Sequence, residues 1–429
     1  MMELLYQKYK TYNNICTDTR NIKKDALYFA LKGKNFNGNE FAKQALENGC
    51  SYAVIDEPEF KKDERYILVK DVLTALQDLA KYHRNKLSIP FIGITGSNGK
   101  TTTKELINGV LKKKYRTFAT HGNLNNHIGV PLSILSIRED TEIAIIEMGA
   151  NHQGEIKFLS GLAKPDYGII TNIGKAHMEG FGGLEGIRKG KGELFDYIKE
   201  KGGRIFLNAN DEVLVEMAYD IPAVTYGSYD TCFISGSFFA ADPYVRFSWN
   251  CPTKGIDNEL LESSLVGNYN YTNILAAVCI GAFFDVETKE INKAIKEYIP
   301  TNNRSQIINT EANSVFLDAY NANPTSMEEA IKNFAAMKGE NKIYILGDML
   351  ELGTESKKEH QNIISLLEKL NPHRVFLVGS HFPLTQNSYE SFRNSEELTH
   401  YLSSQKIMGC SIFIKGSRGI KLEKAVEVL

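Results

Sequence analysis

The segment that most constrains the fold lies at residues 90–104, where the sequence reads PFIGITGSNGKTTTK. The apolar run from Phe91 to Ile94 is typical of a buried strand, and a helical pattern extends from Lys100 to about Lys114. Between them, a glycine-rich loop allows backbone N–H groups to surround phosphate oxygens, and the helix N-terminus adds the positive end of its dipole. A strand, a loop and a helix in this order predict a nucleotide-binding phosphate loop.

The loop departs from the general phosphate-loop pattern at one position. Ile94 stands five residues before Gly99, where that pattern has a glycine, but the shorter pattern Thr-Gly-Ser-x-Gly-Lys-Thr is intact. Within it, Lys100 is placed to reach the β- and γ-phosphates of a nucleotide, and the Thr101 hydroxyl is placed to ligate Mg²⁺. A glycine-rich turn without a ligand is the alternative. The nucleotide-binding residues that the loop predicts are Gly96, Ser97, Asn98, Gly99, Lys100, Thr101 and Thr102.

Composition narrows the kind of protein that carries this loop. A chain of 429 residues suggests about two to four domains, and its net charge of −2 gives no indication of a nucleic-acid or membrane surface. The six cysteines form no Cys-x-x-Cys pair, which argues against zinc or a disulfide framework and favours a reducing cytosol. Residues 1–10 lack the apolar core of a signal peptide, and the longest apolar run, residues 274–284, is too short to cross a bilayer. We therefore expect a cytoplasmic protein without nucleic-acid or membrane partners.

The alternation of strand and helix patterns restarts twice along the chain and predicts an α/β fold in three domains. Residues 1–88 are expected to form a small α/β domain, and residues 89–299 a mostly parallel sheet around the phosphate loop, with antiparallel edge strands within 231–266. Residues 300–429 are expected to form a separate Rossmann-like domain after a hinge at Pro300-Thr301-Asn302-Asn303. The expected strands cover residues 27–31, 52–55, 91–94, 143–147, 167–172, 205–208, 224–226, 315–317, 343–346, 375–378 and 411–414, and a final helix is expected from near Gly419.

Polar residues follow several expected strands, at the sheet edge where parallel α/β sheets bind their ligands. Glu147 ends one strand and is placed to give Mg²⁺ a carboxylate, with an exposed charge as the alternative. His177 follows another strand end, after Asn172 and Gly174, and is predicted to be a ligand rather than a structural histidine. A third polar cluster covers residues 208–211. The sequence therefore predicts that a nucleotide and Mg²⁺ bind at this edge.

No pattern typical of a catalytic serine or cysteine is present, since the chain lacks Gly-x-Ser-x-Gly. The nucleophile is therefore expected to be the substrate itself. Phosphoryl transfer to a carboxylate would give an acyl phosphate that an amine attacks, whereas transfer to water would make the protein a nucleoside triphosphatase. Either reaction depends on positioning and on charge neutralisation by Mg²⁺, Lys100 and an arginine such as Arg304, whose domain is expected to close over the nucleotide.

These motifs together resemble the Mur ligase family, the ATP-dependent amino-acid ligases of bacterial peptidoglycan precursor synthesis. Residues 93–102 resemble the ATP loop of the family, and Glu147-Met148-Gly149 and the segment around His177 resemble its two Mg²⁺ sites. Lys191 lies where the family has a carbamylated lysine that bridges a second Mg²⁺. The resemblance extends over all three domains and implies ATP and Mg²⁺ as cofactors. The catalytic residues that it implies are Lys100, Glu147, His177 and Lys191, and the metal ligands that it implies are Thr101, Glu147, His177 and carbamylated Lys191.

The resemblance also assigns residues around the nucleotide and the UDP-sugar. Asn270 and Asn273 match a Gly-x-His-Asn-x-x-Asn motif in which Tyr269 replaces the usual histidine. Arg304 resembles the family arginine at the γ-phosphate, and Asp318 resembles its ribose-binding aspartate. The residues implied at the UDP-sugar are Thr19, Arg20, Asn123, Asn125 and Asn126. On the residues alone, the polar stretch 17–20 is either a binding loop or a helix cap, and the three asparagines are either ligands or turn residues.

Three segments of the third domain, residues 319–326, 346–353 and 415–418, resemble the branch of the family that adds D-alanyl-D-alanine to UDP-N-acetylmuramoyl-tripeptide. The resemblance implies a monomer in which ATP phosphorylates the tripeptide carboxylate and the dipeptide amine attacks the acyl phosphate. The residues that it implies at the dipeptide are Asn321, Asn323, Ser417 and Arg418. A sibling ligase that adds a different amino acid and a nucleotide-binding module without catalysis are the alternatives.

Overall fold

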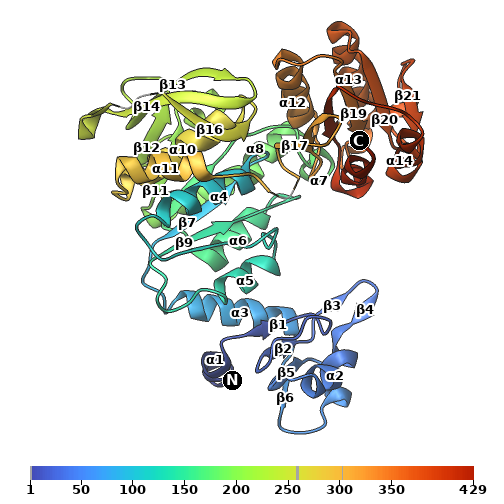
Figure 1. The fold of residues 1–429 in the computed structure, drawn as a ribbon. Helices are drawn as coiled ribbons and strands as arrows, with labels where there is room; N and C mark the ends of the chain where they lie inside the picture. Colours follow the sequence, from blue (N-terminus) through green and yellow to red (C-terminus); the bar gives the residue numbers. More distant parts are fainter. Residues whose placement is uncertain (1, 258–259, 302) are drawn as a thin grey trace.

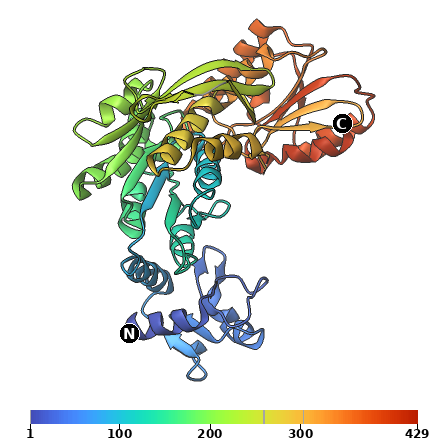
Figure 2. The ribbon, with the colours of Figure 1, turned by 60° about the vertical axis from the view of Figure 1, so that its left-hand side comes forward.

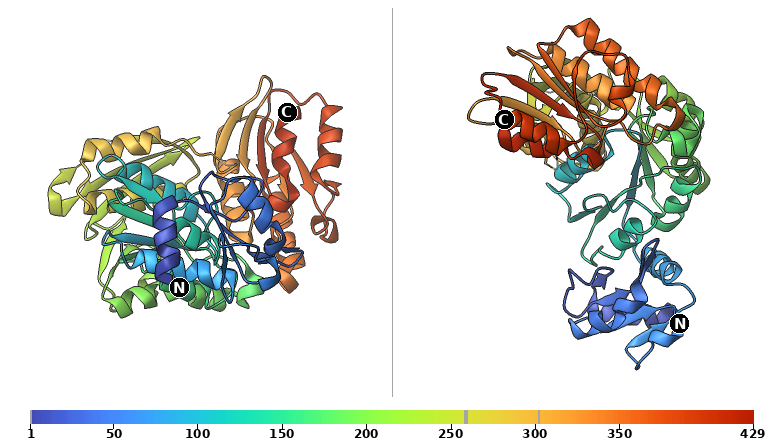
Figure 3. Two further views of the ribbon diagram at one scale, coloured as in Figure 1. Left: turned by 90° about the horizontal axis from the view of Figure 1, so that it is seen from below. Right: turned by 90° about the vertical axis from the view of Figure 1, so that its right-hand side faces the viewer.

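The computed structural model describes residues 2–257, 260–301 and 303–429, so Asn302 of the expected hinge lies outside the described residues. Three large sheets follow one another along the chain (Figure 1), and we call the parts that carry them the N-terminal, central and C-terminal units. Figure 2 and Figure 3 show the same arrangement from other sides: the N-terminal unit lies at one end of the central unit, and the C-terminal unit lies against a different side of it. The predicted α/β fold with mostly parallel sheets is confirmed.

The N-terminal unit is built on a four-stranded parallel sheet in the order β1-β2-β5-β6. Its strands and helices are β1 (Ile15–Cys16), β2 (Leu27–Phe29), β5 (Tyr52–Ile55), β6 (Tyr66–Leu68), α1 (Met2–Tyr12), α2 (Ala42–Glu47) and α3 (Val72–Arg84). Asp71 caps α3, because its carboxylate accepts a hydrogen bond from the Thr74 N–H at 2.7 Å. The buried face of α3 shares one core with α5 (Gly129–Ile134) and α6 (Glu155–Ala163), which joins this unit to the central one.

The central unit carries a ten-stranded sheet in the order β15-β14-β13-β12-β11-β10-β7-β9-β8, with β16 paired to β14. Its strands are β7 (Phe91–Thr95), β8 (Thr117–Ala119), β9 (Ile143–Glu147), β10 (Tyr167–Ile170), β11 (Arg204–Asn208), β12 (Ala223–Gly227), β13 (Ile234–Ala241), β14 (Tyr244–Cys251), β15 (Ile256–Asp257) and β16 (Leu261–Val266). Strands β7 to β13 pair in parallel, whereas β14 pairs antiparallel with β13, β15 and β16. The antiparallel edge predicted within 231–266 is therefore confirmed.

Helices cover both faces of the central sheet, as a parallel sheet with fully buried strands requires. These helices are α4 (Lys100–Leu111), α10 (Asn270–Phe283) and α11 (Thr288–Glu297) on one face, and α6 and α8 (Leu184–Lys201) on the other. Alternate residues of β7 face the two layers, because Phe91 belongs to the core under α6 and α8 while Ile92 and Ile94 belong to the core under α4 and α10. Across the described part of the chain, no helix combines the length and apolar character that crossing a bilayer requires.

The C-terminal unit contains a six-stranded sheet in the order β17-β18-β22-β19-β20-β21, parallel except at β17. Its strands and helices are β17 (Gln306–Asn309), β18 (Ser314–Asp318), β19 (Ile343–Gly347), β20 (Arg374–Val378), β21 (Glu390–Phe392), β22 (Ser411–Lys415), α12 (Pro324–Ala336), α13 (Ser356–Leu370) and α14 (Ser395–Ser403). The predicted final helix is wrong in type, because the chain forms two short 3-10 segments, Arg418–Ile420 and Leu422–Val428. Lys421 separates them with a left-handed backbone (φ 59°), a conformation that an α-helix does not continue through.

Candidate active site

A cavity of about 680 Å³ lies between the carboxyl ends of strands from two sheets, β7, β9 and β10 of the central unit and β18 and β22 of the C-terminal unit. This is the edge where parallel sheets bind ligands. The predicted site residues that line it are Ser97, Asn98, Gly99, Lys100, Thr101, Thr102, Asn123, Asn125, Asn126, Glu147, His177, Asn270, Asn273, Arg304, Asp318, Asn321 and Asn323. The structure therefore brings together residues that are separated by more than two hundred positions in the sequence.

Two glycines of the phosphate loop are required by its geometry. Gly96 (φ 141°) and Gly99 (φ 78°) both have positive φ, which side chains disfavour. A Cβ atom on Gly96 would lie 2.0 Å from the Thr171 hydroxyl oxygen, and one on Gly99 would lie 2.7 Å from the Asn273 side-chain oxygen. The loop can pack this closely against β10 and α10 only with glycine at both positions.

Lys100 lies over the loop that it follows in the sequence. Its Nζ donates hydrogen bonds to the carbonyl oxygens of Gly96, at 2.7 Å, and Ser97, at 3.2 Å. Burial lowers the pKa of Lys100 to about 8, against the opposing effect of the nearby Glu147 carboxylate, and Arg304 lowers it further. A bound anion would favour the charged form of Lys100. The loop carbonyls hold its ammonium group where the phosphates of a nucleotide would lie.

Glu147, at the end of β9, lines the cavity with a buried carboxylate. The residue is 1% exposed. Its Oε1 accepts hydrogen bonds from the Asn125 side-chain amide at 2.8 Å and from the Thr101 hydroxyl at 3.3 Å. Its Oε2 lies 3.6 Å from Nζ of Lys104 and has no hydrogen-bond partner among residues 2–257, 260–301 and 303–429. A buried carboxylate oxygen without a hydrogen bond, beside a threonine hydroxyl, is an oxygen donor set that suits Mg²⁺.

His177 and Lys191 occupy different positions relative to the cavity. His177 lines it, has a left-handed backbone (φ 55°) just before α7 (Met178–Phe181), and contacts the Glu351 carboxylate of the C-terminal unit through Nδ1. Lys191 lies on α8 behind the lining, is 1% exposed, and donates from Nζ to the Ala150 carbonyl at 3.0 Å. Burial lowers its pKa well below the usual lysine range, and the positive charge of Lys100 adds to the effect. Among the described residues, no three His, Cys, Asp or Glu side chains form a metal-binding cluster.

Asparagines at the start of α10 connect it to the phosphate-loop helix. Asn270 donates to the Val266 carbonyl at 2.8 Å, and Asn273 donates to the Asn270 side-chain oxygen at 2.9 Å. The Thr103 hydroxyl of α4 donates to the Asn273 side-chain oxygen at 3.0 Å. Tyr269, which replaces the histidine of the family motif, shares a hydrogen bond of 3.1 Å between its hydroxyl and that of Ser305. Position 269 thus contributes to the contact between the central and C-terminal units.

The C-terminal unit supplies the cations and polar groups on the opposite wall. The Arg304 guanidinium stacks 3.5 Å over the Tyr320 ring, and its Nε has no hydrogen-bond partner within the part of the chain that the structure describes. Asp318 forms an ion pair of 2.5 Å with Lys415. Asn323 donates from its amide to the Asn98 side-chain oxygen at 2.7 Å, which ties this wall to the phosphate loop. An unpaired arginine nitrogen beside the loop is available to an anionic ligand.

Some predicted site residues do not reach the cavity. These are Thr19, Arg20, Gly96, Lys191, Ser417 and Arg418, and none of the described residues before Ser97 lines it. Arg20 is exposed and pairs with Asp18 in a turn, and no described helix begins within residues 17–24, so the helix-cap alternative for this stretch is wrong. Ser417 is buried, and its hydroxyl oxygen accepts a hydrogen bond from the Leu350 N–H at 3.0 Å. The polar cluster 208–211 also lies elsewhere, because Asp211 caps α9 (Glu212–Met217).

The structure adds lining residues that the sequence did not assign. Asn172 accepts a hydrogen bond from the Asn98 N–H at 3.0 Å, and Lys415 pairs with Asp318 across two strands. Tyr320 provides the ring beneath Arg304. The sequence feature that could have identified them is their position relative to strands. Lys415 ends a strand, and Asn172 and Tyr320 follow strand ends, where ligand-binding residues of such sheets concentrate.

A phosphate loop at the edge of a parallel sheet, faced across a cavity by a second parallel sheet, defines the chain as a nucleotide-dependent enzyme of multidomain α/β type. Three family descriptions match it in succession: the Mur ligase family catalytic domain at residues 11–84, the Mur ligase middle domain at 94–281 and the Mur ligase glutamate ligase domain at 303–409. The chain belongs to the Mur ligase family.

Individual relatives match over nearly the whole chain. The UDP-N-acetylmuramoyl-tripeptide–D-alanyl-D-alanine ligase of Bacillus subtilis is 37% identical over 97% of this chain and 93% of the relative. The protein of the same name from Escherichia coli is 32% identical over 98% of this chain and 94% of the relative. Among solved structures, MurF from Acinetobacter baumannii has a TM-score of 0.86 at 29% identity, covering 96% of this chain and 92% of that one.

Proposed function

We propose that the chain is an ATP-dependent ligase that joins D-alanyl-D-alanine to UDP-N-acetylmuramoyl-tripeptide, giving the pentapeptide precursor, ADP and phosphate. The observation that carries this proposal is the cavity, in which the phosphate loop faces the Arg304, Asp318 and Asn321–Asn323 wall at hydrogen-bond distance. The two relatives that bear this activity in their names, each more than 30% identical over nearly the whole chain, support it.

Two steps on the substrates account for the overall reaction. The tripeptide carboxylate attacks the γ-phosphorus of ATP, ADP leaves, and an acyl phosphate forms. The amine of D-alanyl-D-alanine then attacks the acyl carbon, and the tetrahedral intermediate expels phosphate to leave an amide. Lys100 and Arg304 lie where they can neutralise charge on the transferring phosphoryl group. Closure of the C-terminal unit over bound substrates would exclude water that otherwise hydrolyses the acyl phosphate.

Mg²⁺ fits the donor set around Glu147. We assign Thr101, Glu147 and His177 as its ligands, together with Lys191 if that lysine is carbamylated. When bound, Mg²⁺ would neutralise the phosphate oxygens and act as a Lewis acid. Lys191 suits carbamylation because burial lowers its pKa, and a neutral amine is the form that adds CO₂.

The remaining site residues are assigned by substrate, and those among them that lie outside the cavity lining are Gly96, Thr19, Arg20, Ser417 and Arg418. Nucleotide binding is assigned to the loop residues Gly96 to Thr102 and to Asn270, Asn273, Arg304 and Asp318. The UDP-sugar is assigned to Thr19, Arg20, Asn123, Asn125 and Asn126, and the dipeptide to Asn321, Asn323, Ser417 and Arg418. The dipeptide residues lie in two loops, at the ends of β18 and β22, that flank the same wall.

We further propose that the chain acts as a monomer in the cytoplasm, where ATP is available, with functional domains at residues 1–88, 89–299 and 300–429.

Product analysis tests the proposed function. The purified chain is incubated with ATP, Mg²⁺, UDP-N-acetylmuramoyl-tripeptide and D-alanyl-D-alanine, and the products are separated and weighed by mass spectrometry. The proposal predicts a UDP-linked product. Its mass should exceed that of UDP-N-acetylmuramoyl-tripeptide by the mass of D-alanyl-D-alanine minus one water. A product that carries a single amino acid, formed from a shorter precursor, would assign the chain to a sibling ligase instead.

A further inference from the structure

The loop at residues 347–353 of the C-terminal unit reaches the central unit beside the cavity. At its tip, the Glu351 carboxylate lies at ion-pair distance from Nδ1 of His177, and that ring nitrogen has no hydrogen-bond partner among the described residues. The Glu351 carbonyl also accepts a hydrogen bond from the Glu179 N–H at 3.4 Å. The C-terminal unit thus contacts both a side chain and the backbone of the segment that follows β10 in the central unit.

Both residues of this contact have strained backbones. His177 has φ 55° and Glu351 has φ 64°, in the left-handed region that residues other than glycine seldom adopt. Such strain persists only where the surrounding structure imposes it, and it is concentrated at functional sites. The structure around His177 and Glu351 therefore holds both backbones in this conformation.

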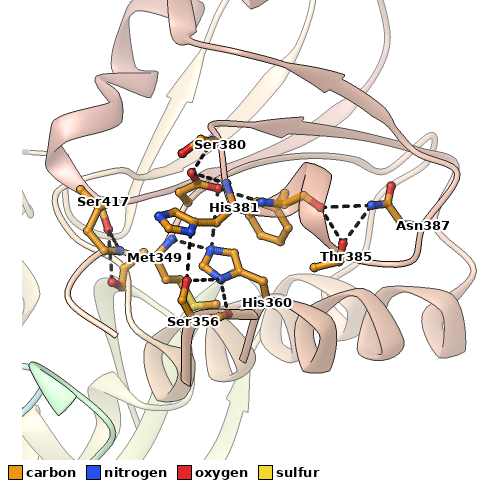
Figure 4. A network of polar contacts seen from close by, with 12 residues as sticks. Met349, Ser356, His360, Ser380, His381, Thr385, Asn387 and Ser417 are labelled. Atoms are coloured by element: carbon orange, nitrogen blue, oxygen red, sulfur yellow. Dashed lines mark hydrogen bonds and ion pairs between the residues drawn. The ribbon is translucent and has the colours of Figure 1, made fainter. Parts of the chain in front are cut away.

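A buried polar cluster imposes the conformation of the Glu351 loop (Figure 4). Asp348 is 1% exposed, and its carboxylate accepts hydrogen bonds from the N–H groups of Ser380 at 2.6 Å and His381 at 2.9 Å. His360, which is fully buried, accepts a hydrogen bond from the Met349 N–H at 3.1 Å through Nε2. His360 must then carry its proton on Nδ1, which donates to the Ser356 carbonyl at 2.7 Å. The residues that precede Glu351 are thus fixed from two sides.

The same loop contacts the segment that carries the predicted dipeptide residues. The Leu350 N–H, next to Glu351, donates to the Ser417 hydroxyl at 3.0 Å, and the Ser417 N–H donates to the Asp348 carbonyl at 3.1 Å. Figure 4 shows Ser417 and Met349 side by side in this cluster. The 347–353 loop therefore connects the end of β22 to His177.

We propose that Glu351 is a positioning residue that orients the imidazole of His177 from across the interface between the units. A carboxylate on Nδ1 fixes the tautomer with the proton on Nδ1, which leaves the Nε2 lone pair free for a ligand in the cavity. The Asp348–His360 cluster holds Glu351 in place, so His177 is oriented only when the C-terminal unit is docked. The ligand role of His177 rests on the proposed function, whereas the orientation itself does not.

The tautomer of His177 is the direct readout. We would record the ring ¹⁵N signals of His177 in the metal-free, full-length protein, and assign them with a His177→Gln variant. In the wild-type protein we expect the Nδ1–H form to dominate. In Glu351→Ala we expect a mixture of tautomers shifted toward the Nε2–H form, which free imidazole favours. Glu351→Gln should retain the wild-type pattern, because its amide oxygen still accepts a hydrogen bond from Nδ1–H.

Two control variants separate orientation from docking and from a general effect on the loop. Lys175→Met removes another ion pair between the units, the 2.7 Å contact with Glu359. Glu355→Ala removes a partly exposed carboxylate that pairs with Lys358 within the same unit. Neither should change the His177 tautomer.

Glu351→Ala alone should raise the Mg²⁺ concentration that gives half-maximal ADP formation, by about 10-fold or more. This is the usual effect of losing a group that orients a metal-binding histidine.

The proposal is overturned if Glu351→Ala keeps the wild-type tautomer, or if Lys175→Met shifts it equally. The tautomer is measured without metal or substrate, so this test does not depend on the proposed function. Absence of ligation by the wild-type protein would count against the proposed function and not against the orientation of His177.

Discussion

Nδ2 of Asn323 donates a hydrogen bond of 2.7 Å to Oδ1 of Asn98, and so joins the first turn of α12 to the phosphate loop. The same side chain caps α12, since its Oδ1 accepts a hydrogen bond from the Ser326 N–H at 2.9 Å. One asparagine therefore contributes both to the stability of the C-terminal unit and to the geometry of the nucleotide site in the central unit.

The two roles of Asn323 can be separated by a matched variant. Asn394 caps α14 in the same way, by accepting from the Glu397 N–H at 2.9 Å, but does not line the cavity. Asn323→Ala and Asn394→Ala should each cost about 1 kcal/mol of stability, the usual effect of losing a cap, measured by thermal unfolding. Only Asn323→Ala should also raise KM for ATP, by about 3- to 10-fold, the value of one net hydrogen bond. Equal KM values in both variants would show that the bond to Asn98 is irrelevant to the nucleotide.

Lys100→Ala should reduce ADP formation by about 10²-fold or more, because it removes a preorganised positive charge from the phosphate site. The fold should be retained, since the two carbonyl groups that Nζ contacts belong to the loop itself. Lys112→Ala, at an exposed position after the end of the same helix, is the control and should keep wild-type activity. Turnover by Lys100→Ala close to the wild-type rate would contradict the assignment of the loop.

Lys191→Met should abolish ligation and yet stabilise the fold at neutral pH in CO₂-free buffer. Burial lowers the pKa of Lys191 in the folded state, so between that pKa and the ordinary lysine value the unfolded chain binds more protons, and stability rises with pH. The advantage of the methionine variant should therefore be present near neutral pH and fade as the pH rises toward about 10.4. Thermal unfolding at several pH values measures it.

Bicarbonate provides the second half of the Lys191 test. If the lysine is carbamylated, bicarbonate should raise the activity of the CO₂-depleted wild-type protein and leave the stability of Lys191→Met unchanged. A methionine variant that is less stable than wild type at neutral pH without CO₂ would contradict the account of an amine whose charged form is destabilised by burial.

Tyr269→Phe should have a small effect, although the family motif has a histidine there. The variant loses the hydrogen bond to Ser305, worth about 1 kcal/mol of stability, and keeps the ring that packs against Gly267. Burial raises the pKa of Tyr269 well above its usual range, so the hydroxyl stays neutral and the pH profile of ligation should not change. We expect KM for ATP to stay within about threefold; a loss comparable to that of Lys100→Ala would give the hydroxyl a direct role.

Sequence patterns predicted the interior strands well because both faces of these strands are buried. β5 and β9 have the predicted bounds, and β7 extends one residue beyond its predicted end. Five of the strands that were missed, β1, β6, β8, β17 and β21, lie at sheet edges, bond on one side only and have partly exposed residues. The two-residue strands Lys32–Gly33 and Phe36–Asn37, which pair with each other, were also missed. An edge strand of three or four such residues has no continuous apolar run to reveal it.

The candidate site could be predicted as far as it is local. The phosphate loop is a continuous segment whose residue types and spacing determine its geometry, so the sequence placed Lys100 and Thr101 together at a strand–helix junction, and both line the cavity. Their roles stay predictions. Contacts such as Glu351 with His177, or Lys415 with Asp318, join residues far apart in the chain and depend on how the units dock. The end of β22 was correctly placed near the site, but the direction in which Ser417 points is set by the buried cluster around Asp348, which no local pattern encodes.

The most direct test of the central claim is phosphate release from ATP and Mg²⁺, measured with each substrate present or omitted. The account predicts release that requires both UDP-N-acetylmuramoyl-tripeptide and D-alanyl-D-alanine, because the acyl phosphate needs the carboxylate of the first and the amine of the second to turn over. Release with a single amino acid and a shorter precursor, but not with the dipeptide, would contradict it.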